Sequence, residues 1–270
     1  MNSLNELLSL EGKTAVVTGG GRGLGRIAAE ALLRAGARVL VASRKKADCE
    51  ATAEALSPLG HIEGFEGDVA TAAGVAALVA EIRSRTDAVD VLLNNAGTTW
   101  GASLETFPWD AWNKVMSVNV TGAFTLTRDL LPELSARATL ADPSRVVNVG
   151  SILGTAPIPD DSYSYGASKA ALHHVTRVLA AELAPRHITV NAIAPGPFES
   201  KMTAFALGKS DVRESVAGSM PLGRIGEPDD IAGAILFLAG RAGRYVTGSI
   251  MPLDGGLSIE ARSKLLTSHL

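Results

Sequence analysis

Seven short runs of β-branched and apolar residues alternate with Ala-rich stretches along the chain, and this alternation limits the possible folds more than any other feature. The stretches between the runs, such as 25–35 and 72–83, carry apolar residues at helical spacing. Strands that alternate with helices are joined by right-handed crossovers, which produce a parallel sheet covered on both faces. We therefore predict an α/β fold in which one doubly wound domain spans residues 1–270. Its seven parallel strands are expected at residues 14–18, 38–43, 62–67, 89–94, 145–149, 188–193 and 249–253.

Charge and cysteine content exclude several functions. The 270 residues include 25 Lys and Arg against 28 Asp and Glu, which gives a formal net charge of −3. Without a strongly basic cluster, the chain has no electrostatic footprint for nucleic acid or anionic lipid. Because Cys49 is the only cysteine, neither an intrachain disulfide nor a cysteine-built zinc site can form. No other residues show the spacing of metal ligands.

The sequence shows no sign of export or membrane insertion. Its first ten residues lack the basic start and the long apolar stretch of a secretory signal. The longest apolar run, residues 231–239, is far shorter than the roughly 20 residues that cross a bilayer. We therefore expect a soluble, cytoplasmic protein.

Two segments depart from the alternation. Residues from about 196 to 221 mix Gly, Pro, Met, Phe and Ser without a clean period, directly after the sixth predicted strand. Ligands of open parallel sheets bind beyond the carboxyl ends of the strands, so we predict that this segment is a substrate lid. Residues from about 258 to 270 form a C-terminal tail that either packs on a neighbouring copy or stays loose.

A glycine-rich loop follows the first predicted strand and opens the next helix. Residues 18–25 have the pattern TGxxxGxG. Glycines let the backbone approach a pyrophosphate, and the helix N-terminus offers unpaired N–H groups. An ordinary tight turn can have the same composition, so the position between strand and helix carries the prediction. The predicted dinucleotide contacts in this loop are Gly19, Arg22, Gly23, Leu24 and Gly25.

The end of the second predicted strand indicates which dinucleotide binds. An NAD site would have an acidic residue about 20 residues after the loop, but this chain has Ser43 and Arg44 there. Arg22 and Arg44 could hold a 2′-phosphate together, with a hydrogen bond from Ser43. Both arginines could instead be solvated surface residues. We predict NADP(H) as the cofactor.

Three residues predict proton-transfer chemistry. Tyr165 and Lys169 are four residues apart in a predicted helix over 163–183, which puts both side chains on one face. A nearby ammonium favours the phenolate, and would lower the pKa of Tyr165 from its usual value near 10. Tyr163 lacks such a partner, because Ala167 lies four residues after it. Ser151 directly follows the fifth predicted strand and could donate to a substrate oxygen, or serve only as a turn residue.

Taken together, these residues resemble the classical short-chain dehydrogenase/reductase family, which has a Rossmann fold. The resemblance runs from Lys13 to about Gly256. It implies that Tyr165 is the general acid/base of a hydride transfer between NADPH and a ketone, that Ser151 polarises the carbonyl, and that Lys169 tunes the tyrosine and binds the ribose. It also implies that Asn119 holds a water linking Lys169 to solvent, although a buried Asn that only braces a helix bend is an equal alternative.

The same resemblance implies the remaining cofactor contacts and the oligomeric state. The adenine would lie against Asp68 and Val69, and a wall beside the cofactor would come from residues 95–97. The nicotinamide would lie near residues 195, 196 and 200. These contacts are Asp68, Val69, Asn95, Ala96, Gly97, Pro195, Gly196 and Ser200. Members of the family are homo-oligomers, so a dimer or tetramer is expected.

Apolar residues surround the predicted substrate position, namely Trp100, Leu153, Phe198, Met202 and Phe205. They fit a bulky hydrophobic ketone, although core or subunit packing would select the same residue types.

The chain resembles 3-oxoacyl-[acyl carrier protein] reductases at residues 94–101, but it departs from them elsewhere. Such reductases often have arginines where this chain has Pro132 and Ala181, so an acidic carrier would lose two contacts. Our first hypothesis is a stand-alone NADPH-dependent ketone reductase or alcohol dehydrogenase. An acyl-carrier-protein reductase of fatty acid or lipid biosynthesis is the alternative. A non-catalytic NADPH-binding regulator is a third hypothesis, which the complete Ser151, Tyr165 and Lys169 set disfavours.

Overall fold

The computed structural model of the protein describes residues 3–199 and 210–259. It contains one seven-stranded parallel sheet in the order β3-β2-β1-β4-β5-β6-β7. The predicted fold class and all seven predicted strands are confirmed, and the strand ends differ from prediction by at most two residues. The strands are β1 (Thr14–Thr18), β2 (Arg38–Ser43), β3 (Ile62–Glu66), β4 (Val91–Asn94), β5 (Ser144–Val149), β6 (Ile188–Pro195) and β7 (Ile250–Leu253).

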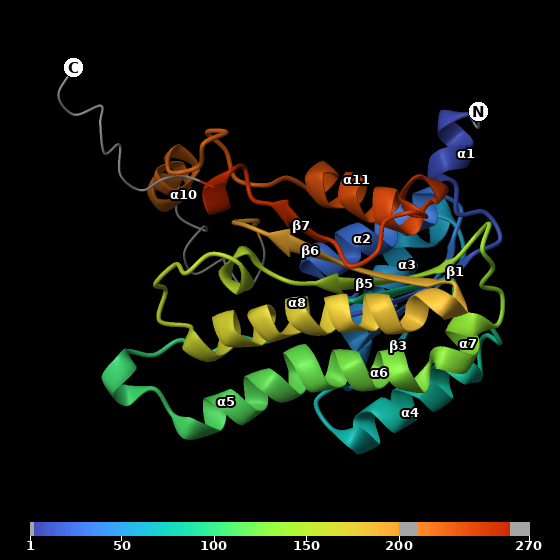
Figure 1. Cartoon of the computed structure of the whole chain (residues 1–270), viewed down its shortest axis with the longest axis horizontal. Helices are drawn as coiled ribbons and strands as arrows, with labels where there is room; N and C mark the ends of the chain where they lie inside the picture. The colour runs from blue at the N-terminus through green and yellow to red at the C-terminus, as the bar shows by residue number, and fades with distance from the viewer. Residues whose placement is uncertain (1–2, 200–209, 260–270) are drawn as a thin grey trace.

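Helices cover both faces of the sheet (Figure 1). One face packs against α2 (Gly23–Arg34), α3 (Lys46–Leu56) and α11 (Pro228–Ala239). The other packs against α4 (Ala72–Arg83), α6 (Ala123–Asp129) and α8 (Tyr163–Leu183), and α5 (Trp109–Met116) continues the layer. The remaining helices are α1 (Leu4–Leu8), α7 (Leu131–Ser135) and α10 (Ser210–Gly218). Because both faces are covered, every residue of β5 and β6 is buried, which explains their unbroken apolar runs.

A buried polar ladder fixes α6 and α8 against the centre of the sheet. Asn94 and Asn148 are paired in register on β4 and β5, and Asn94 Nδ2 donates to Asn148 Oδ1 at 2.9 Å and to Thr127 Oγ1 on α6 at 3.0 Å. Asn148 Nδ2 donates in turn to Thr176 Oγ1 on α8 at 2.8 Å. Directional bonds of this kind set the position of a helix more sharply than apolar contact does.

Ion pairs lie at the amino ends of the strands. Asp90 is 2% exposed, and it accepts from the Thr14 N–H at 2.8 Å and pairs with Lys13 and Arg137.

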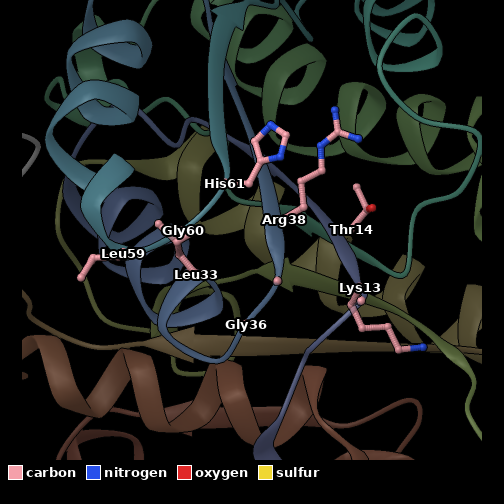
Figure 2. Close-up of a pocket in the computed structure, with 10 residues that line it drawn as sticks. Lys13, Thr14, Leu33, Gly36, Arg38, Leu59, Gly60 and His61 are labelled. Atoms are coloured by element: carbon pink, nitrogen blue, oxygen red, sulfur yellow. The ribbon is translucent and has the colours of Figure 1, made fainter.

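A pocket of about 360 Å³ lies at this amino edge of the sheet (Figure 2). Its basic side chains already have carboxylate partners, since Arg38 and His61 both pair with Glu63. Ligands of such sheets bind at the opposite edge, and we assign none here.

No helix within residues 3–199 and 210–259 is long and apolar enough to span a membrane. Much of the predicted lid and almost all of the predicted tail lie outside these ranges, as do Ser200, Met202 and Phe205. The lid, the tail and the roles of these three residues stay predictions.

Candidate active site

A cleft of about 550 Å³ opens at the carboxyl ends of the strands, where the strand order reverses between β1 and β4. Every predicted cofactor contact among the described residues lines it. These are Gly19, Arg22, Gly23, Leu24, Gly25, Ser43, Arg44, Asp68, Val69, Asn95, Ala96, Gly97, Tyr165, Lys169, Pro195 and Gly196. Residues more than 170 positions apart in the sequence thus meet at one edge of the sheet.

The glycine loop is held by the turn that follows β4. Asn95 Nδ2 donates to the carbonyls of Thr18 and Gly19, at 2.8 and 3.1 Å. Gly19 has a φ of +67°, and a Cβ on it would lie 2.8 Å from Asn95 Nδ2. A Cβ on Gly25 would collide with the same amide and with the Gly19 carbonyl. Only glycine fits at these two positions, so the backbone can approach both Asn95 and a bound group.

The N-terminus of α2 faces the cleft without a side-chain cap. Its N-cap residue is Arg22, whose side chain makes no capping hydrogen bond, whereas α4 is capped by the Thr71 hydroxyl. The first N–H groups of α2 and the positive end of its dipole are therefore available to an anion such as a pyrophosphate.

Basic side chains dominate the cleft beyond β2. Arg22, Arg44 and Lys45 line it and are exposed, and none of them pairs with a carboxylate among the described residues. Asp48, in the first turn of α3, also lines this part of the cleft. The excess of positive charge fits a 2′-phosphate, and the end of β2 has no acidic residue to accept from a ribose 2′-hydroxyl. Lys45 was not predicted as a contact, although it directly follows Arg44.

Lys169 places a buried ammonium at the floor of the cleft. The residue is 3% exposed, and its Nζ donates to the Val149 carbonyl at 2.7 Å. Burial lowers the pKa of Lys169 to about 8, because the charged form loses its hydration. The ammonium lies 5.5 Å from the centroid of the Tyr165 ring.

Burial raises the pKa of Tyr165, which corrects the expectation from the sequence. Removal of the phenol from solvent is the largest cause, a hydrogen bond with Ser151 opposes it, and the charge of Asp160 adds to the rise. Lys169 does not offset this rise, and its Nζ lies 5.5 Å from the ring centroid and donates to the Val149 carbonyl. A phenol is protonated at neutral pH whether its pKa is ordinary or raised, so Tyr165 holds a proton that it could donate.

Ser151 faces Tyr165 from the end of β5. It is 6% exposed and begins a short 3₁₀ turn over residues 152–154, where its Oγ accepts from the Leu153 N–H at 3.2 Å. It therefore does act as a turn residue, while its hydroxyl still reaches the phenol. Both residues line the cleft, and a carbonyl oxygen placed between their hydroxyls could accept from both.

Asn119 lies in a π-helical turn over residues 117–122, between α5 and α6. It is 1% exposed, its Oδ1 accepts from the Thr98 N–H at 2.8 Å, and its Nδ2 donates to the Thr98 carbonyl and to Ser168 Oγ, both at 2.9 Å. Both amide hydrogens are thus used, so the side chain could only accept from a water. The bonds agree with the bracing hypothesis, and the water relay stays a prediction. The sequence motifs predicted no role for Thr98 or Ser168.

The predicted substrate residues are only partly gathered at the cleft. Phe198 lines it and is 5% exposed. Trp100 and Leu153 are not among the described lining residues, and the Trp100 ring lies 5.0 Å from the Lys114 ammonium of α5. Val118 and Val149 contribute apolar surface that was not predicted.

Two histidines follow Lys169 on α8. His173 is 3% exposed and packs behind the Ser151 turn, and burial lowers its pKa to about 4, while His174 is exposed. Within the described ranges, no group of three or more His, Cys, Asp or Glu side chains could hold a metal ion.

Comparison with known proteins identifies similar oxidoreductases over nearly the whole chain. A family model described as enoyl-(acyl carrier protein) reductase matches residues 19–258. The chain is 43% identical over 256 residues to the rhamnolipids biosynthesis 3-oxoacyl-[acyl-carrier-protein] reductase of Pseudomonas aeruginosa, covering 95% of this chain and 100% of that protein. It is 37% identical over 259 residues to a galactitol 2-dehydrogenase of Rhizobium johnstonii, covering 95% and 99%.

A solved structure agrees closely in fold. The RhlG/NADP active-site complex of Pseudomonas aeruginosa superposes with a TM-score of 0.92 at 43% identity, covering 94% of this chain and 99% of that one.

The lowered pKa of Lys169 makes the stability of the protein depend on pH. The pKa is about 8 in the folded chain and about 10.4 in an unfolded one. Between these values the unfolded chain binds more protons, so stability rises with pH. Relative to a Lys169→Met variant, the wild type should gain about 2 kcal/mol in free energy of unfolding between pH 8 and pH 10. Urea unfolding across this range measures the difference.

Lys46→Met is the matched control, because Lys46 is exposed and only pairs with Glu50 on the helix surface. Its stability difference from wild type should stay flat over the same range. A flat difference for Lys169→Met would mean that the buried amine keeps an ordinary pKa.

Proposed function

This chain belongs to the short-chain dehydrogenase/reductase family, and we propose that it reduces a bulky, hydrophobic ketone to a secondary alcohol with NADPH. The convergence of Ser151, Tyr165 and Lys169 at the floor of the cleft carries this proposal. The reaction is reversible, so the same residues would oxidise the alcohol with NADP⁺.

NADP(H) is the cofactor of the protein, an assignment supported by both charge and homology. Arg22, Arg44 and Lys45 supply positive charge where a 2′-phosphate would lie, and the Pseudomonas relative was solved with NADP. The uncapped α2 and the glycine loop would hold the pyrophosphate, and Lys169 the ribose. When bound, the cofactor supplies a hydride for the carbonyl carbon.

Tyr165 is the proton donor in the proposed reaction. The phenol of Tyr165 is protonated at neutral pH, so a proton is available for the carbonyl oxygen as that oxygen gains negative charge. Ser151 donates a second hydrogen bond to the same oxygen and fixes its position. Lys169, whose ammonium lies 5.5 Å from the centroid of the tyrosine ring, does not lower the pKa of this phenol, and its proposed role is to bind the ribose of the cofactor.

The apolar lining supports a substrate without charge. Phe198, Val118 and Val149 line the cleft, and a fairly large hydrophobic ketone would bury most of its surface against such a lining. Pro132 and Ala181 are both exposed and uncharged, so an acidic carrier protein finds no arginine at these two places.

Reduction of a 3-oxoacyl chain on acyl carrier protein is the alternative. The relative that is 43% identical bears that activity in its name, and a 3-oxoacyl group is itself a ketone that the same residues could reduce. A non-catalytic NADPH-binding role is a third possibility, which any NADPH-linked turnover would eliminate.

We also propose that the protein forms a homo-oligomer, a dimer or a tetramer. Large apolar side chains are exposed on α5, α6 and α8, including Trp109 at 81%, Phe124 at 39% and Val178 at 49%. A second copy of the chain would remove this surface from water.

Tyr165→Phe tests the catalytic assignment, because it removes only the hydroxyl. We expect kcat to fall by about 10²-fold or more while the affinity for NADPH stays within a few-fold, since proton donation is lost and the cofactor cleft is kept. NADPH absorbance with a panel of ketones measures turnover. Tyr163→Phe is the control, because Tyr163 is exposed and is not among the described residues that line the cleft. Turnover near the wild-type value in Tyr165→Phe would refute the assignment.

Arg44→Asp tests the choice of cofactor. An acid at this place repels a 2′-phosphate and accepts from a 2′-hydroxyl, so the preference for NADPH over NADH should drop by about tenfold or more. Fluorescence titration with each cofactor measures both affinities. Lys46→Asp changes the charge equally outside the cleft lining and should leave the preference unchanged. An unaltered preference in Arg44→Asp would contradict the proposed role of this arginine.

The substrate class is tested with one 3-oxoacyl chain presented in two ways. The chain is attached either to acyl carrier protein or to a small uncharged ester group. Both substrates present the same ketone to Tyr165. If the protein is a stand-alone ketone reductase, kcat/KM for the ester and for free bulky ketones should match or exceed that for the carrier. A carrier that raises kcat/KM by about 10²-fold, equivalent to about 2.7 kcal/mol, would establish the alternative.

A further inference from the structure

Ser168 is a fully buried residue of α8 that makes two hydrogen bonds at the active site. It lies between Tyr165 and Lys169 in the sequence and is 0% exposed. Its Oγ donates to the Tyr165 carbonyl at 2.7 Å and accepts from Asn119 Nδ2 at 2.9 Å. A hydroxyl can donate and accept at once, and both capacities are used here.

The second of these bonds connects α8 to the wall of the cleft. Asn119 holds Thr98 by two hydrogen bonds, from the Thr98 N–H at 2.8 Å and to the Thr98 carbonyl at 2.9 Å. Thr98 lines the cleft. A continuous chain of hydrogen bonds therefore runs from the cleft wall through the π-helical turn to the backbone of Tyr165.

We infer that Ser168 is a positioning residue, which sets the place of Tyr165 relative to the cleft wall formed by Thr98. This inference rests on the proposed function, in which Tyr165 donates the proton. Without the Ser168 hydroxyl, one N–H of Asn119 is buried and unpaired, so Asn119 and Thr98 must shift to find a partner or remain unsatisfied. Either result loosens the link between the wall and the tyrosine, and proton transfer is sensitive to such small displacements.

Ser164 supplies a matched control on the same helix. It lies one turn before Ser168 and is also 0% exposed, but its Oγ has no hydrogen-bond partner among the residues that the structure describes. Ser164→Ala and Ser168→Ala therefore remove the same atom at the same burial from the same helix. They differ in that the Ser168 Oγ makes two hydrogen bonds, whereas the Ser164 Oγ makes none with the described residues.

Steady-state kinetics with NADPH and a ketone compare the two variants. Ser168→Ala should lower kcat by about tenfold and leave both KM values within about twofold, because binding groups are kept and only the alignment for proton transfer is lost. Ser164→Ala should stay within about twofold in every parameter. An unchanged kcat in Ser168→Ala, or an equal loss in Ser164→Ala, would overturn the inference.

Two further measurements keep the test decisive. If Ser168→Ala does not fold, Ser168→Cys replaces the hydroxyl with a somewhat larger thiol that is only a weak donor and acceptor, and an undiminished kcat in that variant would count against the inference. Hydrogen–deuterium exchange over residues 163–169 requires no turnover. Exchange should be faster in Ser168→Ala than in Ser164→Ala, and equal rates would refute the link even if the wild type reduced no ketone. A wild type without ketone reduction, in contrast, would count only against the proposed function.

Discussion

The side-chain amide of Asn95 joins the ends of β1 and β4, and the shape of the cleft depends on this contact. Two carbonyls of the glycine loop accept from it, and the Thr18 hydroxyl accepts in return from the N–H groups of Asn95 and Ala96, both at 3.0 Å. The space beside Gly19 and Gly25 is taken by that amide. A side chain at either glycine would push the loop away from β4, and with it the N-terminus of α2. The cofactor loop and the wall opposite it are therefore a single hydrogen-bonded unit.

At the floor of the cleft, the proposed chemistry depends on how burial shifts the pKa values of Lys169 and Tyr165. Lys169 is buried without a carboxylate partner among the described residues, and its pKa falls to about 8. Close by, burial holds the proton on Tyr165. Loss of hydration thus destabilises the charged form of both groups. The phenol keeps its proton, and the pKa of the amine moves closer to neutral pH. A developing negative charge on a substrate oxygen would meet both in a region of low dielectric, where each interaction is strong.

Much of the fold and the site could be predicted because the signals are local. The strand runs and the helix over 163–183 follow from periodicity, and Tyr165 and Lys169 share a face through their spacing alone. The links between elements could not be predicted in this way. Ser168 and Asn119 are 49 positions apart, and the Lys114 ammonium of α5 lies over the Trp100 ring. Likewise, the pKa of Tyr165 depends on burial that only the packed chain produces.

The missing side-chain cap of α2 affects the lifetime of the folded protein. A pyrophosphate at the N-terminus of this helix takes the place of the side-chain cap that the sequence does not provide. A ligand that binds only the folded chain adds about 2.7 kcal/mol to its stability when its concentration is 100 times Kd. The cofactor is then part of the architecture as well as a reactant. The lifetime of the protein against unfolding and proteolysis would follow the size of the nucleotide pool around it.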